Sequence, residues 1–127
     1  MLDTDSVSYA LRGEGNVAAR ILQRRPSELC MSSVTLAELR FGAHKRGSRR
    51  LQRLIDTFVA SVAPLPFDAA AADGFGRLAA ELALKGTPIG AFDAMIAAHA
   101  ISQKLVLISN NVRHFSRVAN LRSENWL

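Results

Sequence analysis

Short apolar runs alternate with helix-compatible stretches along this sequence, and that alternation constrains the fold more than any other feature. The strand-like runs are Met1–Asp3, Leu29–Ser32, Val62–Pro66, Leu105–Ile108 and Leu121–Trp126. Parallel strands cannot be joined by a tight turn and need a crossover, usually a helix. The alternation therefore predicts an α/β fold with a short central parallel sheet flanked by helices on both faces. Because prolines cannot donate ladder hydrogen bonds, the two prolines of Val62–Pro66 predict an edge strand.

Helices are predicted between these runs from the spacing of apolar residues and from residues typical of helix ends. The predicted helices span about Ser6–Leu11, Asn16–Arg25, Thr35–Lys45, Ser48–Ala60, Asp68–Lys85, Ala91–Gln103 and Val112–Val118. Gly47 and Gly86 stand just beyond two of them, where a glycine commonly ends a helix. A chain of 127 residues has the length of one domain, so residues 1–127 are interpreted as a single unit.

The net charge and the cysteine content indicate which binding partners and which cellular compartment to expect. Sixteen Lys and Arg against eleven Asp and Glu give a formal net charge of +5, which favours polyanionic partners without distinguishing nucleic acid from an acidic protein. The single Cys30 excludes an internal disulfide. The N-terminus lacks an apolar signal segment, and no apolar run approaches the roughly 18 residues of a membrane span. We therefore expect a cytoplasmic protein that does not enter a membrane.

Polar residues at the predicted strand ends indicate where chemistry can occur. Asp3 closes the first run and Asn111 follows Leu105–Ile108, while Glu38 and Asp93 lie in the first turns of predicted helices. Ligands of parallel sheets bind beyond the carboxyl ends of the strands, so three carboxylates are expected to converge there. Carboxylates brought together repel each other unless a cation offsets them, and Mg²⁺ or Mn²⁺ prefers such oxygen ligands. The hypothesis is a divalent-metal site for phosphodiester hydrolysis.

Each of these residues also has a structural interpretation. Thr35–Glu38 matches a capping box, in which Glu38 only reaches back to a backbone N–H. Asp93 would complement the helix macrodipole, and Asp3 and Asp5 would stabilise a turn. Asn111 would cap the helix that follows it. Residue by residue, the structural and the catalytic interpretation both stay open.

Four ordered motifs resemble a known family. They are Leu2–Asp5, Ser33–Gly42, Pro88–Ala100 and Leu107–Phe115. In this order and spacing they resemble PIN-domain toxins of the VapC type, and the resemblance extends to Glu124–Trp126. It implies a PIN-like nuclease domain over residues 1–127, the toxin component of a type II toxin–antitoxin pair. It also implies an endoribonuclease that depends on Mg²⁺ or Mn²⁺ and hydrolyses structured RNA, tRNA included, through a metal-activated water.

The resemblance assigns roles to individual residues. The family's first, second and third acids fall on Asp3, Glu38 and Asp93. Asp3 and Asp93 would then hold the metal directly. Glu38 would bind it through a water or position the attacking water.

Accessory positions depart from the family pattern. Many relatives carry a fourth acid where this chain has the neutral Asn111, which favours one metal ion over two. Asp5 stands where Asn is common, and its role as a ligand or as an N-cap stays open. Ser109 in the same motif as Asn111 is a further accessory candidate. The resemblance further implies a homodimer, a cognate VapB-type antitoxin, and operator DNA bound only through the antitoxin complex.

A basic stretch forms a second candidate element. Its members are Arg40, Lys45, Arg46, Arg49, Arg50 and Arg53, with no acid among them. They would suit an RNA phosphate backbone, and equally an antitoxin-docking surface or a solvated helix face. His99 lies six residues after Asp93, about 240° around a helix, so a structural role is expected. His114 follows the Asn pair, where it would approach a substrate, but a position on the exposed surface is favoured.

Two other functions remain to be weighed. A response-regulator receiver domain has similar length and alternation, but Asp56 lies inside a predicted helix and no Lys follows the strongest strand. The second is a catalytically weak or inactive PIN-fold module that acts mainly through antitoxin and nucleic-acid binding. The acids at positions 3, 38 and 93 disfavour this module, whereas Asn111 keeps it open.

Overall fold

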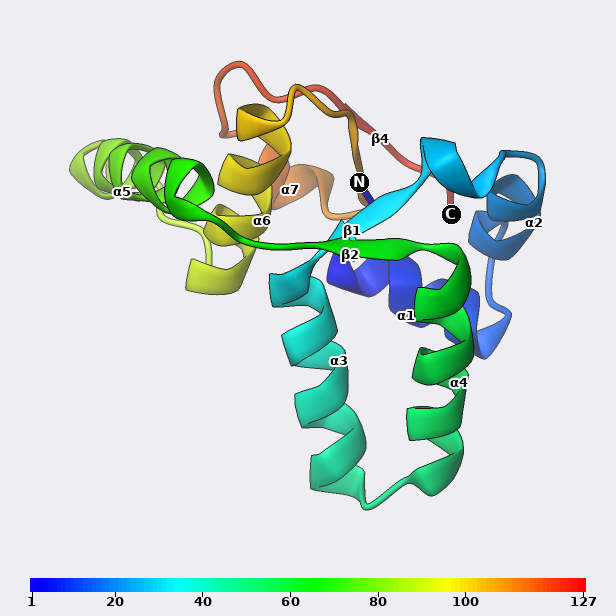
Figure 1. Ribbon diagram of the computed structural model, residues 1–127. Coiled ribbons are helices and arrows are strands. Elements are labelled where there is room, and N and C mark those ends of the chain that lie inside the picture. Colours follow the sequence, from blue (N-terminus) through cyan, green and yellow to red (C-terminus); the bar gives the residue numbers. More distant parts are fainter.

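The computed structural model describes residues 1–127 and is organised around a small parallel sheet (Figure 1). Its strands are β1 (Cys30–Ser32), β2 (Ala63–Leu65), β3 (Leu107–Ile108) and β4 (Ser123–Glu124). β1 pairs with β2 and β3 pairs with β4, both in parallel. Leu2 joins the two pairs because it forms parallel bridges to both Met31 and Ile108. The predicted parallel sheet is confirmed, and the proline-containing β2 lies at its edge.

The first predicted strand is shorter than expected. Only Leu2 of Met1–Asp3 pairs with its neighbours, because the helix that follows begins at Thr4. The final strand is likewise reduced to β4. The helices are α1 (Thr4–Arg12), α2 (Val17–Leu22), α3 (Ser33–Arg46), α4 (Arg49–Ser61), α5 (Ala69–Leu84), α6 (Ala91–Ser102) and α7 (Val112–Phe115). Helix α2 ends at Leu22, three residues before the predicted end at Arg25, and a 3₁₀ turn follows at Pro26–Glu28. Arg25 is extended, as expected of a residue before proline.

Cap residues explain where the helices begin and end. Asp68 accepts a hydrogen bond from the backbone N–H of Ala71 at 3.0 Å, as expected of the N-cap of α5. The N-cap of α3 is Ser32 and the helix begins at Ser33, two residues before the predicted start at Thr35. Gly47 ends α3 in the left-handed conformation at φ 61°, which glycine adopts at little cost.

Helices cover both faces of the sheet, as the alternation predicted. Successive strand residues point to opposite faces. Leu2, Met31 and Ile108 belong to a core shared with α1, α2, α3 and α4. Met1 and Leu107 belong to a second core shared with α5, α6 and α7. The two cores hold the sheet between them and fix the positions of the strand ends.

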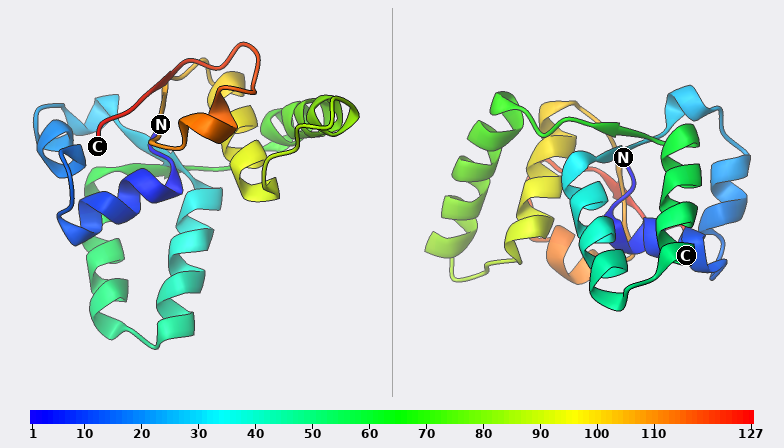
Figure 2. Two further views of the ribbon diagram at one scale, coloured as in Figure 1. Left: turned by 180° about the vertical axis from the view of Figure 1, so that it is seen from behind. Right: turned by 60° about the horizontal axis from the view of Figure 1, so that its bottom comes forward.

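The arrangement leaves one long projection. Helices α3 and α4 form a hairpin that extends away from the sheet, while α5 packs along α6 on the other side (Figures 1 and 2). None of the helices combines the length and the apolarity needed to cross a membrane.

Candidate active site

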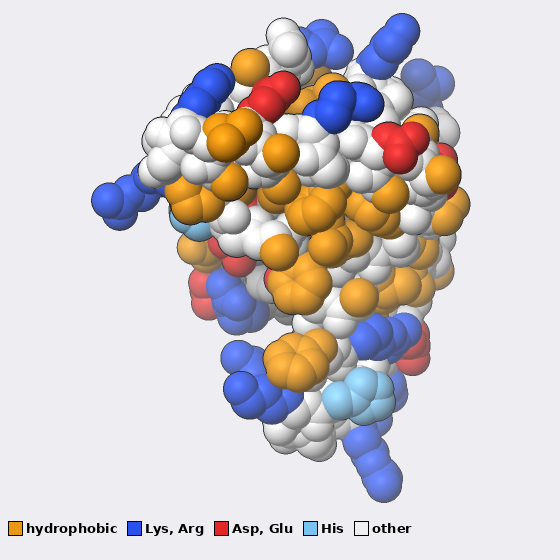
Figure 3. Space-filling view, turned by 90° about the vertical axis from the view of Figure 1, so that its left-hand side faces the viewer, with side chains coloured by type: hydrophobic (Ala, Val, Ile, Leu, Met, Phe, Trp, Pro, Cys, Tyr) orange, Lys and Arg blue, Asp and Glu red, His pale blue; other side chains and the backbone are white.

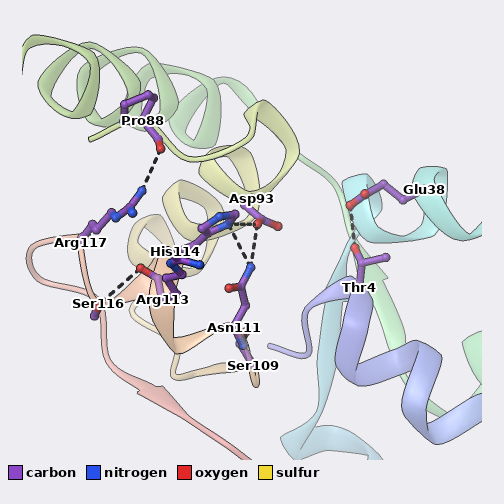
Figure 4. Close-up of polar contacts among 10 residues, drawn as sticks. All are labelled: Thr4, Glu38, Pro88, Asp93, Ser109, Asn111, Arg113, His114, Ser116 and Arg117. Carbon is purple, nitrogen blue, oxygen red and sulfur yellow. Dashed lines mark hydrogen bonds and ion pairs between the residues drawn. The ribbon is translucent and has the colours of Figure 1, made fainter. Parts of the chain in front are cut away.

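The candidate residues lie where the central strands end. Asp3 directly follows Leu2, and Ser109 directly follows β3. Glu38 is in the second turn of α3 and Asp93 in the first turn of α6. Figure 4 shows Glu38 and Asp93 on opposite sides of a gap, each with a carboxylate oxygen directed toward the other side. The topology therefore brings acids from three distant parts of the chain to one edge of the sheet.

Asp3 is a buried carboxylate with two functions. Its Oδ1 accepts a hydrogen bond from the Ser6 backbone N–H at 2.8 Å and caps α1, and the residue is 3% exposed. Burial raises the pKa of Asp3, and the opposing donors, the Ser109 hydroxyl and the Ser6 N–H, reduce this rise without cancelling it. A buried negative charge of this kind is costly unless a cation compensates it. The structural interpretation of Asp3 as a turn-stabilising residue is correct and is compatible with metal binding.

Glu38 does not form the capping box that its spacing suggested. Thr35 is inside α3, and Oε1 of Glu38 instead accepts a hydrogen bond from the Thr4 hydroxyl at 2.7 Å. Burial raises the pKa of Glu38, and the negative charges of Asp93, Asp5 and Asp3 raise it further. Glu38 is thus held toward α1 and lies within electrostatic reach of the other acids.

Asp93 is held by two residues of the last motif. Its Oδ2 lies 2.9 Å from Nδ1 of His114 and 3.3 Å from Nδ2 of Asn111 (Figure 4). His114 therefore lies at the acidic site, and its side chain is also partly exposed. The sequence contained a clue, because positions 111 and 114 are three residues apart and face the same way in a helical turn.

The accessory candidates separate into different roles. Asp5 is exposed in the first turn of α1, and since Asp3 is the N-cap, the capping interpretation of Asp5 is wrong. Its charge still acts on Glu38 and Asp3. Ser109 is buried, and its hydroxyl accepts a hydrogen bond from the Asn111 backbone N–H at 2.9 Å, which shapes the turn before α7.

The donor chemistry fits a hard divalent cation. A cation stabilises this set of three carboxylates. Burial raises the pKa of both Asp3 and Glu38, and the negative charges of the other acids raise the pKa of Glu38 further. Glu38 and Asp93 each keep one carboxylate oxygen without a protein hydrogen bond. No three His, Cys, Asp or Glu side chains gather closely enough to hold one ion between them, so an ion here would take one or two carboxylates directly and complete its shell with water.

The basic stretch divides into one structural residue and an exposed group. Arg40 donates to Oε1 of Gln52 at 2.6 Å and to Oδ1 of Asp56 at 2.6 Å, and so connects α3 to α4. These contacts give Arg40 a structural role, and its assignment to RNA or partner binding stays a prediction. The exposed members are Lys45, Arg46, Arg49, Arg50 and Arg53. Lys and Arg side chains surround the end of the hairpin in Figure 3; we refer to these five residues as the hairpin basic group.

His99 has the structural role expected of it. The ring is fully buried, and its Nδ1 lies 2.8 Å from the Ser32 hydroxyl. Burial lowers the pKa of His99, which favours the neutral ring. The residue therefore ties α6 to the end of β1 and takes no part in the acidic site.

Comparison with known proteins agrees with the fold and with the order of the motifs. The PIN domain family model matches residues 1–121. The tRNA(fMet)-specific endonuclease VapC of Shigella flexneri is 41% identical over 127 residues, covering 99% of this chain and 96% of that protein. The crystal structure of DNA-bound VapBC from Salmonella typhimurium contains a chain with a TM-score of 0.90 and 38% identity, covering 100% of this chain and 97% of that chain.

A second solved structure gives the same result. VapBC2 from Rickettsia felis, bound to a DNA fragment from its promoter, matches with a TM-score of 0.89 and 33% identity over 100% of this chain and 98% of that chain. The receiver-domain alternative is therefore excluded by the family match as well as by the missing acceptor residues. The chain belongs to the PIN-domain family and, within it, to the VapC group.

Proposed function

We propose that this chain is the toxin component of a type II toxin–antitoxin pair and a divalent-metal-dependent endoribonuclease. The observation that carries the proposal is the meeting of Asp3, Glu38 and Asp93 at one sheet edge, where burial raises the pKa of Glu38 and the charges of the other acids raise it further. The relative named as a tRNA(fMet)-specific endonuclease supports structured RNA, and tRNA in particular, as substrate.

We assign the three acids different roles in hydrolysis. Asp3 and Asp93 would hold Mg²⁺, with Mn²⁺ as a substitute. When bound, the ion supplies Lewis-acid stabilisation of the charge that develops on the scissile phosphate and lowers the pKa of a coordinated water. Glu38, fixed by its 2.7 Å hydrogen bond from Thr4, would orient the attacking water and accept its proton.

Partners follow from the solved relatives. The VapBC structures from Salmonella typhimurium and Rickettsia felis are complexes bound to DNA. By analogy this chain would bind a VapB-type antitoxin and reach operator DNA only through that complex. A basic antitoxin side chain placed among the acids would complement their charge. The homodimer implied by the resemblance stays a prediction.

A catalytically weak module remains the second candidate because Asn111 is neutral where relatives carry an acid. RNA cleavage assays with the purified chain distinguish the two. Structured and unstructured RNA would be incubated with Mg²⁺, with Mn²⁺ and with EDTA. We expect cleavage of structured RNA with either metal and none with EDTA. Absence of cleavage under all three conditions, with RNA binding retained, would favour the module.

The hairpin basic group gives a prediction about RNA binding. Replacing Arg46, Arg49 and Arg50 with Gln should weaken RNA binding and flatten its dependence on salt, because each lost phosphate contact lowers the log–log slope by about 0.7–0.9. Binding would be measured at several salt concentrations, with Arg77→Gln on α5 as a single-charge control for net charge. If only antitoxin binding changed, the group would be a protein interface instead.

A further inference from the structure

The contacts of Asp93 support an inference that rests on the proposed metal site and deepens it. Oδ2 of Asp93 has two neighbours, Nδ1 of His114 at 2.9 Å and Nδ2 of Asn111 at 3.3 Å. Nδ2 of Asn111 and Nδ1 of His114 also lie 3.0 Å apart, so the three atoms form one cluster. An ionised carboxylate can only accept hydrogen bonds, so the tautomer that satisfies Oδ2 carries the imidazole hydrogen on Nδ1, with both nitrogens donating to the same oxygen. The other oxygen, Oδ1, has no protein hydrogen bond and points toward the side of Glu38 in Figure 4.

We propose that His114 is a positioning residue of the active site. Together with Asn111 it holds Oδ2 of Asp93, so that Oδ1 is the oxygen presented to a divalent cation. Carboxylates that bind metals are commonly oriented by hydrogen bonds of this kind from residues that do not touch the metal. The neutral Asn111 thus has a function where an acid would have added a ligand.

Local structure makes this pair of donors rigid. The Asn111 backbone N–H donates to the Ser109 hydroxyl at 2.9 Å, and the Asn111 carbonyl accepts from the Phe115 N–H at 3.2 Å. Phe115 is 2% exposed and fixes α7 in the second core. Because α7 is anchored at both ends, the side chains of Asn111 and His114 are directed to the same point.

His114 does not serve to fill the core. Its side chain is 36% exposed and that of Asp93 is 28% exposed, so shortening the imidazole opens no buried cavity. A variant at position 114 is therefore expected to fold, and a change in metal affinity can be read as a change in the Asp93 carboxylate.

Metal titration of the full-length chain tests the proposal. His114→Ala should weaken Mn²⁺ and Mg²⁺ binding, measured by calorimetry, by about 10–100-fold. His114→Asn should recover most of the affinity, since its amide nitrogen is as many bonds from the backbone as Nδ1. His114→Gln should not, because its amide nitrogen lies near the position of Nε2. Val112→Ala, at an exposed position of the same helix, is the matched control.

The outcomes separate this proposal from the proposed function. If Asp93→Asn loses metal affinity but His114→Ala binds as tightly as the native chain, the positioning role is overturned and the metal site stands. Equal recovery by the Asn and Gln variants would also overturn it, because the role depends on Nδ1. If Asp93→Asn itself binds metal normally, the metal site at Asp93 is wrong, and the positioning role is overturned with it.

Discussion

Replacing Asp93 with Asn is expected to lower the rate of metal-dependent RNA cleavage by at least about 100-fold, the upper end of what is lost when residues around a metal ligand are removed. The substitution preserves shape but not charge. The amide must either turn its NH₂ toward the metal or place it against the donors of His114 and Asn111, which now face the Oδ2 carboxylate oxygen. Both orientations oppose metal binding.

The measurement compares cleavage rates of a structured RNA at saturating Mg²⁺, with circular dichroism to show that the variant is folded. Asp73→Asn is the matched control, because it makes the same chemical change on the exposed face of α5. Native rates in Asp93→Asn, or cleavage that continues in EDTA, would contradict the proposed mechanism.

Replacing Asp3 with Asn should remove cleavage and at the same time stabilise the metal-free protein. Asparagine can still accept the Ser6 N–H as the N-cap of α1, where it is as favourable as aspartate. It does so without placing a negative charge in a site that is 3% exposed. Burial is the largest cause of the raised pKa of Asp3, so the neutral side chain suits the folded state better than the charged one.

The effect on stability depends on pH in a defined direction. Because the pKa of Asp3 is raised on folding, the native chain binds this proton more tightly than the unfolded chain. Its contribution to stability is present below the unfolded pKa of about 3.9 and is lost as pH rises through the higher folded pKa. At neutral pH the variant should therefore unfold at a higher temperature, since each kcal/mol gained raises Tm by roughly 2–8 °C.

Thermal unfolding of both proteins between pH 4 and pH 7.5, with and without Mg²⁺, measures this effect. The advantage of Asp3→Asn should grow with pH in EDTA and shrink when Mg²⁺ is added, because the ion stabilises only the chain that binds it. A variant less stable than the native chain at neutral pH in EDTA would show that the Asp3 charge is already compensated within the protein.

Sequence patterns predicted which helices and strands form better than they predicted the residues where these begin and end. The Asp68 cap and the Gly47 stop were predicted correctly because both depend on contacts within a few residues. The capping box at Thr35–Glu38 was wrong because Ser32, at the end of a strand, already caps α3. Glu38 is free to contact Thr4 for that reason, and a contact between residues 34 positions apart leaves no local pattern.

The contacts of Arg40 and His114 were not predicted, and the physical reason is the same for both. Arg40 belongs to a basic run in the sequence, but the α3–α4 hairpin places it against Gln52 and Asp56. His114 is polar and close to the chain end, but the packing of α7 places it on Asp93. In both cases the partner comes from another helix, and the distance between helices is set by packing.

The sequence by itself determined the alternation of strands and helices, the family, and the three acids that the family's motifs mark. The spacing of apolar residues and the order of the motifs can be read from the sequence alone, because they depend only on positions along the chain. Only the tertiary structure decided which oxygen of Asp93 is held and which is free, why Glu38 turns toward Thr4, and that Arg40 joins two helices. These contacts depend on the two hydrophobic cores that pack against opposite faces of the sheet and fix where its strands end. That packing joins residues far apart in the sequence, so no local pattern predicts it.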